Sequence, residues 1–187
     1  MNKLKTIIAA ALVGACAQAY AGPTLSLDVT PNPVVVGSSL QTNVLISDIA
    51  DLYAYEFTLT FDASVLQATS VAEGAFLGTA GATFGSTGVI DNTAGTISFV
   101  YNTLLGPVPG ANGSGSLLNV TFQALGAGSA ALSFSDLLFL DSAAADILVD
   151  ADGAVVNAVP EPGSFLLFGA ALAAAGAMRR RQLAAQR

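Results

Sequence analysis

The side chains that could carry chemistry in this 187-residue chain are almost all carboxylates. The chain has thirteen aspartates and glutamates, no histidine, no tryptophan and a single cysteine, Cys16. The lack of histidine excludes a Ser-His-Asp triad, a Cys-His pair and a histidine-ligated zinc. Asp62 and Glu73 suggest a glycosidase carboxylate pair, but a turn after a strand and a solvated position before Gly74 explain them better. We therefore expect no enzyme activity and no cofactor.

A second group of carboxylates suggests a metal site. Asp141, Asp146, Asp150 and Asp152 lie within twelve residues, and Asp150-Ala151-Asp152-Gly153 resembles part of a calcium loop. The segment lacks the third early ligand and the closing bidentate glutamate of an EF-hand loop. A solvated loop with an Asp-Gly turn is the simpler interpretation, and weak calcium binding through Asp150 and Asp152 is the alternative.

Three tyrosines, Tyr53, Tyr55 and Tyr101, could form a platform on which sugar rings stack. Aromatic residues at strand spacing more often pack in a core or at its rim. The absence of tryptophan also weakens the carbohydrate interpretation. We keep these tyrosines as candidate ligand-binding residues.

The charges of the chain are segregated along its length. All six basic residues lie near the two ends, and residues 6–178 contain none. All thirteen carboxylates lie between Asp28 and Glu161. We expect a domain with this charge to repel nucleic acid and anionic lipid and to attract cations or a basic partner.

The first 21 residues have the pattern of a secretory signal peptide. Lys3 and Lys5 precede a nine-residue apolar stretch, residues 7–15, and Ala19-Tyr20-Ala21 forms a cleavage site. This pattern predicts an N-terminal signal helix that is removed on export. Residues 13–16 also resemble a lipobox, so lipidation of Cys16 is the alternative.

The C-terminal segment, residues 159–181, has three parts in a fixed order. Pro160-Glu161-Pro162 precedes an apolar stretch, residues 164–178, and then a cluster formed by Arg179, Arg180 and Arg181. At about 1.5 Å per residue the apolar stretch is marginal for a bilayer core of about 30 Å, so we expect a short transmembrane helix. The positive-inside rule predicts that the arginines stay cytoplasmic.

This arrangement resembles the PEP-CTERM sorting signal. The resemblance implies processing by an exosortase, a membrane protease, in a Gram-negative bacterium that makes extracellular polysaccharide. It also implies a transient membrane helix. The protein would pass through an inner-membrane intermediate to the cell surface, the outer membrane or the extracellular matrix.

The central part, residues 24–157, shows about nine β-patterned segments separated by Gly, Asn, Ser or Asp clusters. Residues 53–61 alternate most clearly, with Tyr53, Tyr55, Phe57, Leu59 and Phe61 on one face. The glycine-rich residues 106–115 are expected to be a long flexible connection. The pattern predicts an all-β protein, a jelly-roll β-sandwich of about nine strands.

The order of these segments resembles the cohesin family. The matching motifs are residues 57–66 running on to Gly74, Gly95-Thr96-Ile97-Ser98-Phe99, residues 115–122, residues 128–132 and residues 153–156. The resemblance implies a nine-stranded jelly roll, related to cellulose-binding modules, that binds dockerins, small calcium-loaded modules of polysaccharide-degrading enzymes. It also implies contact through the sheet that holds residues 95–101.

The sequence thus favours an exported, non-catalytic binding module with a dockerin-like partner. The alternative is a carbohydrate-binding or structural protein of the biofilm matrix.

Overall fold

The computed structural model describes residues 22–161 and 163. Strand formation there follows the alternation of apolar and polar side chains, most clearly in β4 (Ala54–Phe61). In β4, Tyr55, Phe57, Leu59 and Phe61 are buried and the intervening residues are half-buried. The burial of these four residues agrees with the prediction from the sequence, because alternate side chains of a strand point to the same face.

Eleven strands and one short 3-10 helix, η1 (Leu77–Thr79), are present in the described residues. The other strands are β1 (Thr24–Thr30), β2 (Val34–Val35), β3 (Ser39–Leu52), β5 (Leu66–Glu73), β6 (Thr83–Asp91), β7 (Thr96–Leu104), β8 (Ala111–Ala124), β9 (Gly128–Leu140), β10 (Asp150–Ala151) and β11 (Ala154–Val159). The nine expected segments all form strands. The two additional strands, β2 and β10, have two residues each, too few to show a period.

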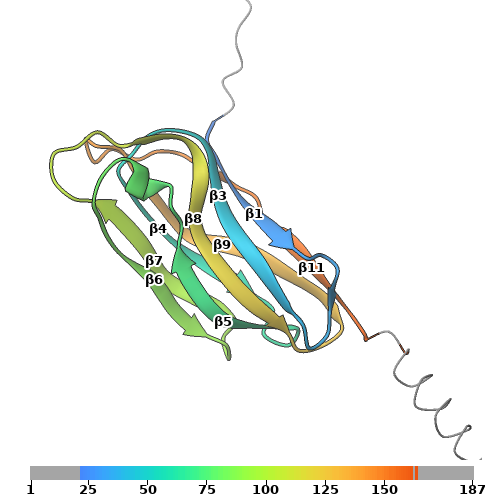
Figure 1. The fold of residues 1–187 in the computed structure, drawn as a ribbon. Coiled ribbons are helices and arrows are strands. Elements are labelled where there is room, and N and C mark those ends of the chain that lie inside the picture. The colour runs from blue at the N-terminus through green and yellow to red at the C-terminus, as the bar shows by residue number, and fades with distance from the viewer. Residues whose placement is uncertain (1–21, 162, 164–187) are drawn as a thin grey trace, which may run out of the picture.

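The strands form two sheets that pack face to face (Figure 1). The five-stranded sheet has the order β10-β1-β3-β8-β5, and the six-stranded sheet has the order β2-β11-β9-β4-β7-β6. The pairings are antiparallel except for β1 with β10 and β11 with β2. The start of β1 and the end of β11 lie at opposite ends of the sandwich. The all-β sandwich predicted from the sequence is confirmed.

One apolar core fills the space between the sheets, and all its fully buried members lie between Leu25 and Ala158. Phe61 and Phe122 join the two sheets through an edge-to-face contact with ring centroids 5.1 Å apart. The domain thus has a core of its own. One polar atom is anomalous: the hydroxyl of Thr42, a residue with no exposed surface, has no hydrogen-bond partner.

The glycine-rich segment is a correction to the expectation. Residues 111–115 are not a flexible connection but the first part of β8, and they pair with the last part of β3. Asn112, Gly113 and Ser114 show no apolar alternation, so the pairing with Ile49 and Leu52 was hidden in the sequence.

The expected membrane-related segments lie largely beyond this domain. The signal helix (residues 1–21) and nearly all of the expected transmembrane helix fall outside the described residues. Across residues 22–161 and 163, no helix is long and apolar enough to span a bilayer.

Candidate functional site

The outer faces of the two sheets differ in polarity. Eleven large hydrophobic side chains are exposed in the described residues: none is on a strand of the five-stranded sheet, three are in loops, and eight are on strands of the six-stranded sheet. These eight are Phe84, Val89, Phe99, Tyr101, Leu137, Leu138, Val155 and Val159. An apolar surface confined to one face is typical of an interaction site.

The five-stranded sheet presents polar rows instead. Paired residues across β1, β3 and β8 place Asp28 beside Asn43 and Asn43 beside Asn119. The next row places Thr30 beside Gln41 and Gln41 beside Thr121. This sheet therefore faces water on its outer side. We call the outer side of β9, β4, β7 and β6 the apolar face.

A line of kinks crosses the apolar face at Thr58. Where β7 pairs with β4, a β-bulge places both Ser98 and Phe99 opposite Thr58. Where β9 pairs with β4 on the other side, a second register shift lies next to Asp136. Phe99 and Asp136 have positive φ angles of 57° and 53°. Gly88 lies opposite Phe99 in β6 with a φ of 91°, and a Cβ there would come within 2.8 Å of the Ser98 carbonyl oxygen.

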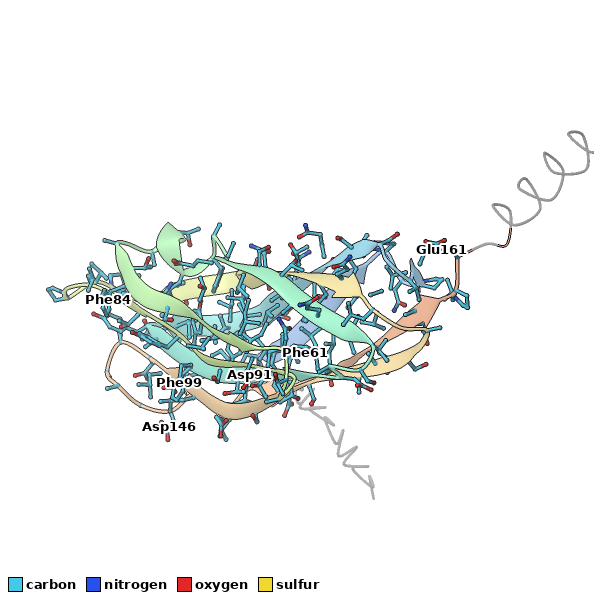
Figure 2. The ribbon with its side chains drawn as sticks, turned by 90° about the horizontal axis from the view of Figure 1, so that it is seen from below. Phe61, Phe84, Asp91, Phe99, Asp146 and Glu161 are labelled. Atoms are coloured by element: carbon cyan, nitrogen blue, oxygen red, sulfur yellow. The ribbon has the colours of Figure 1, made fainter. Side chains whose placement is uncertain are left out.

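The kink decides where Phe99 points. Strict alternation from buried Ile97 would place Phe99 in the core, but the bulge turns it outward, and 65% of its surface is exposed (Figure 2). A left-handed backbone is uncommon for a bulky aromatic residue and costs about 1–2 kcal/mol. Strained residues of this kind cluster at ligand-binding sites.

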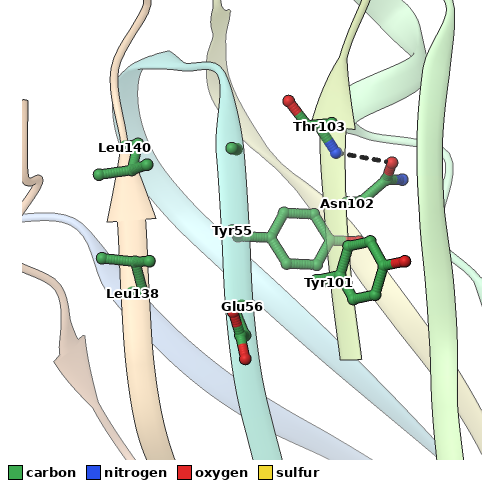
Figure 3. A pocket seen from close by; sticks show the side chains of 8 residues that line it. Tyr55, Glu56, Tyr101, Asn102, Thr103, Leu138 and Leu140 are labelled. Carbon is green, nitrogen blue, oxygen red and sulfur yellow. Dashed lines mark hydrogen bonds between the residues drawn. The ribbon is translucent and has the colours of Figure 1, made fainter. Parts of the chain in front are cut away.

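A shallow cleft lies beside the kink. It has a volume of about 150 Å³, and its outward-facing walls come from three strands: Ala54 and Glu56 of β4, Tyr101 and Thr103 of β7, and Leu138 and Leu140 of β9. Glu56 lies between Leu138 on one side and Tyr101 on the other (Figure 3). Glu56 is the one charged residue in this lining, so the cleft combines apolar walls with a single negative charge.

Buried, hydrogen-bonded side chains lie beneath the cleft. The Tyr55 hydroxyl donates to the Leu117 carbonyl oxygen at 3.0 Å, and the Tyr55 ring stacks near Phe139, with centroids 6.3 Å apart. Burial raises the pKa of the Tyr55 hydroxyl well above its ordinary value, so it remains a proton donor. The buried Asn102 side chain donates to Glu73, and its Oδ1 accepts from the Thr103 N–H at 2.9 Å.

The structure does not bring the three candidate tyrosines onto one surface. Tyr55 is only 4% exposed and points into the core, whereas Tyr101 points outward from the apolar face. The Tyr53 hydroxyl donates to the Gly106 carbonyl oxygen at 2.6 Å, outside the cleft lining. The other exposed aromatic side chains of the apolar face are Phe84 and Phe99. Sequence reasoning missed Phe99 because alternation does not reveal a bulge.

The two carboxylates considered as a glycosidase pair, Asp62 and Glu73, are held apart by the fold. Asp62 accepts hydrogen bonds from the backbone N–H and the hydroxyl of Ser64, which lower its pKa. Asp62 precedes β5 and Glu73 ends it, so about seven residues of strand, roughly 23 Å, separate them. A glycosidase pair requires about 5–9.5 Å between its carboxyl groups.

The candidate calcium residues are part of the sheet edge. Asp150 belongs to β10, its N–H donates to the Pro23 carbonyl oxygen at 3.0 Å, and the N–H of Asp152 donates to Leu25 at 2.8 Å. Within the described part of the chain, no three acidic, cysteine or histidine side chains are grouped so that they could hold a metal.

The sorting residues begin where the domain ends. The last residue of β11, Val159, accepts a hydrogen bond from the Val36 N–H at 2.9 Å, and Pro160 follows directly. Glu161 lies at the end of the domain opposite Phe84 (Figure 2). Ala19, Ala21, Pro162, Arg179, Arg180 and Arg181 lie outside the described residues.

Two family models match the chain. A model for the Cohesin domain matches residues 24–157, and a model for the PEP-CTERM protein-sorting motif matches residues 158–181. No curated protein matches the sequence.

Solved cohesin structures have the same fold. A non-cellulosomal cohesin from Archaeoglobus fulgidus is 18% identical, with a TM-score of 0.55 over 78% of this chain and 96% of that one. The sixth cohesin of scaffoldin B from Acetivibrio cellulolyticus, solved with a Cel5 dockerin, is 22% identical, with a TM-score of 0.56 over 74% and 100%. A type I cohesin–dockerin complex from Clostridium thermocellum matches at 12% identity, with a TM-score of 0.59 over 74% and 94%.

Proposed function

The chain belongs to the cohesin family, and from this premise we propose that its apolar face docks a dockerin-like protein outside the cell. Cohesin domains are non-catalytic binding modules, and the PEP-CTERM motif marks the chain for export and surface sorting in Gram-negative bacteria. Beyond these family properties, we propose which face binds, which residues make the contact and what chemistry the partner has.

The observation that carries the proposal is the one-sided exposure of apolar side chains. Phe84, Phe99, Tyr101 and Leu138 lie on neighbouring strands of one face, whereas the opposite face has no exposed large hydrophobic residue on any strand. Exposed aromatic residues are the usual anchors of protein interfaces. The left-handed backbone at Phe99 supports the same face, because the fold bears strain to keep this ring in solvent.

The charge of the domain indicates a basic partner. Residues 6–178 contain no lysine or arginine, so no side chain of the described domain can neutralise Glu56 in the cleft. A partner's lysine or arginine can lay its aliphatic stem against Leu138 and Tyr101 and bring its charge to Glu56. Binding of this kind weakens with added salt, because salt screens the attraction.

The binding test uses residues 22–161, which contain the whole core. Calcium-loaded dockerin-like modules from the same genome are titrated against this domain by calorimetry. We expect Phe99→Ala to weaken binding at least about tenfold, as interface anchors do. Leu125→Ala removes an exposed leucine of the loop between β8 and β9, whose N–H donates to the Val65 carbonyl oxygen outside the cleft lining, and serves as the matched control. Absence of binding to every such module would refute the dockerin version.

Sorting through the C-terminal segment is tested separately. We propose that an exosortase recognises Pro160-Glu161-Pro162 and that the membrane helix is transient. Replacing the three residues with alanine is expected to retain the protein in the membrane fraction. Unchanged release of the variant would remove the exosortase from the proposal while leaving the docking face untouched.

A second candidate function is polysaccharide binding on the same face. Three exposed aromatic rings, Phe84, Phe99 and Tyr101, support it, because aromatic side chains offer flat apolar surfaces. Affinity electrophoresis in gels that contain the host's exopolysaccharide tests this candidate. Equal mobility with and without the polysaccharide would count against it.

A further inference from the structure

The connections at the two ends of the sandwich differ in charge. At the end far from Glu161, the Ser142 hydroxyl donates to the Asp51 carboxylate at 2.6 Å, so the end of β3 meets the connection between β9 and β10. Asp141 and Asp146 also lie in this connection. At the other end, where the C-terminal segment leaves the domain, three connections contain no charged residue: residues 31–33, 36–38 and 125–127. We call these three connections the tail-proximal end.

Hydrogen bonds gather the tail-proximal end around the last strand of the domain. The Val36 N–H donates to the Val159 carbonyl oxygen at 2.9 Å, and the Gly37 N–H donates to the Ala124 carbonyl oxygen at 2.8 Å. The Asn32 side chain donates to a backbone carbonyl oxygen of β11 at 2.8 Å. All three connections therefore lie close to the point where the chain leaves β11.

The tail-proximal end is apolar as well as uncharged. The exposed apolar residues in or beside its connections are Pro31, Pro33, Leu125 and Val159. The turn after β4 adjoins this end, because the Leu125 N–H donates to the Val65 carbonyl oxygen at 2.7 Å. The carboxylates that come closest along the chain are Asp28 and Asp62, which precede Pro31 and Val65 by three residues, and Glu161 in the C-terminal segment.

Chain length limits how far this end can lie from a bilayer. Only Pro162 and Gly163 separate Glu161 from the apolar stretch, residues 164–178. Three extended residues span at most about 10 Å. As a helix the apolar stretch covers about 23 Å, less than the roughly 30 Å of a bilayer core, so it leaves no slack. A helix that is too short draws its flanking residues toward the headgroups. While the stretch spans the membrane, the tail-proximal end is therefore held within reach of the lipid headgroups.

We infer, on the basis of the proposed membrane helix, that the tail-proximal end is a lipid-contact surface, which rests on the bilayer that the C-terminal segment spans. Anionic headgroups repel carboxylates, so they favour contact with the three uncharged connections over contact with the acidic far end. The exposed side chain of Leu125 can bury apolar surface among the lipids. Because Phe84 lies at the end opposite Glu161, the bilayer leaves that part of the apolar face free for a partner (Figure 2).

Fluorescence quenching in vesicles tests the lipid contact. Residues 22–187 contain no cysteine, so one introduced cysteine carries the label. Leu125→Cys, at a position that is 49% exposed, places the label at the tail-proximal end. Leu105→Cys is the matched control, because Leu105 is 51% exposed and lies in the connection after β7, where its N–H donates to the Ala82 carbonyl oxygen. The vesicles contain phosphatidylethanolamine, phosphatidylglycerol and a lipid with a quencher on its headgroup. We expect loss of fluorescence at residue 125 and none at residue 105.

Sedimentation with the same vesicles separates the lipid contact from the membrane helix. A chain that does not sediment with the vesicles would refute both. A chain that sediments but is quenched equally at residues 125 and 105, or at neither, would overturn the lipid contact alone. Circular dichroism checks that both cysteine variants fold.

Hydrogen exchange supplies a measurement that needs no variant. Amides of residues 125–127 should exchange more slowly in the vesicle-bound chain than in residues 22–161 in solution, whereas amides of residues 105–110 should not change. Unchanged exchange at residues 125–127 would contradict the lipid contact. Slower exchange that appears only after the exosortase is added would assign this end to the enzyme and would also overturn the lipid contact.

Discussion

Because the backbone of Phe99 is strained, a substitution there should affect the stability of the fold and the binding of a partner differently. Phe99 has a φ of 57° and is 65% exposed, so its side chain contributes little burial while its backbone is strained. Replacing it with asparagine, which tolerates the left-handed region, relieves part of that strain. Phe84→Asn is the control: Phe84 is 61% exposed and has no positive φ.

The magnitude follows from the difference between these two variants. Each loses about one third of the burial of a phenylalanine, worth about 0.5–1 kcal/mol, and each puts a poor strand former into a strand. Only Phe99→Asn regains strain energy, of the order of 1 kcal/mol out of the 1–2 kcal/mol that a left-handed residue costs. Phe99→Asn should therefore be about 1 kcal/mol more stable than Phe84→Asn.

Urea denaturation followed by far-ultraviolet circular dichroism measures this difference. With a slope of about 2 kcal/mol per molar urea, the two midpoints should differ by about 0.5 M. Calorimetry with the basic partner should show weaker binding for Phe99→Asn although its fold is intact. The reasoning would be refuted if Phe99→Asn were as unstable as Phe84→Asn.

Three further substitutions test the interior and the loops. Asn92→Ala should lower the free energy of unfolding by about 2–3 kcal/mol, because it leaves the N–H and C=O of the nearly buried Ala68 unpaired. Asn43→Ala is the control. The Asn43 Nδ2 makes one long contact of 3.5 Å, so this variant should change little in the same urea assay. Thr42→Val should raise the free energy of unfolding by about 1 kcal/mol, because it removes a buried hydroxyl that has no hydrogen-bond partner. A lower melting temperature than that of the parent protein would contradict this. Hydrogen bonds from Ser142 and Gly110 lower the pKa of Asp51 from its ordinary value of 3.8. The ionised Asp51 side chain therefore stabilises the folded state fully above pH 3.8, and this contribution is lost as the pH falls through the lowered pKa. Asp51→Asn should therefore lower stability at pH 7 and flatten the acid limb of a stability–pH profile; an unchanged profile would refute the linkage.

Local sequence pattern predicted most of the strands. In β4, Tyr55, Phe57, Leu59 and Phe61 alternate with polar residues, and the structure buries those four. Where residues do not alternate, the prediction was wrong: Asn112, Gly113 and Ser114 form a strand because β3 extends alongside them. The strands β2 and β10 were invisible for a related reason, since two residues define no period.

The candidate site was less predictable than the fold. The sequence groups Tyr55 with Tyr101, yet the two side chains point to opposite sides of the same sheet. Alternation places Phe99 with Ile97 in the core, and the bulge opposite Thr58 reverses it. The bulge depends on the pairing of β7 with β4 and β6, which are distant segments of the chain.

The sequence by itself determined the class of the protein. Its two ends, its acidic centre free of basic residues and its alternating strands indicated an exported β-sandwich. Composition and alternation are local properties, so they can be read along the chain. Only the tertiary structure decided which face is apolar, that Phe99 points into solvent, and which strands form the edges of each sheet. These features depend on which strands become neighbours and in what register, and pairing between distant residues sets both.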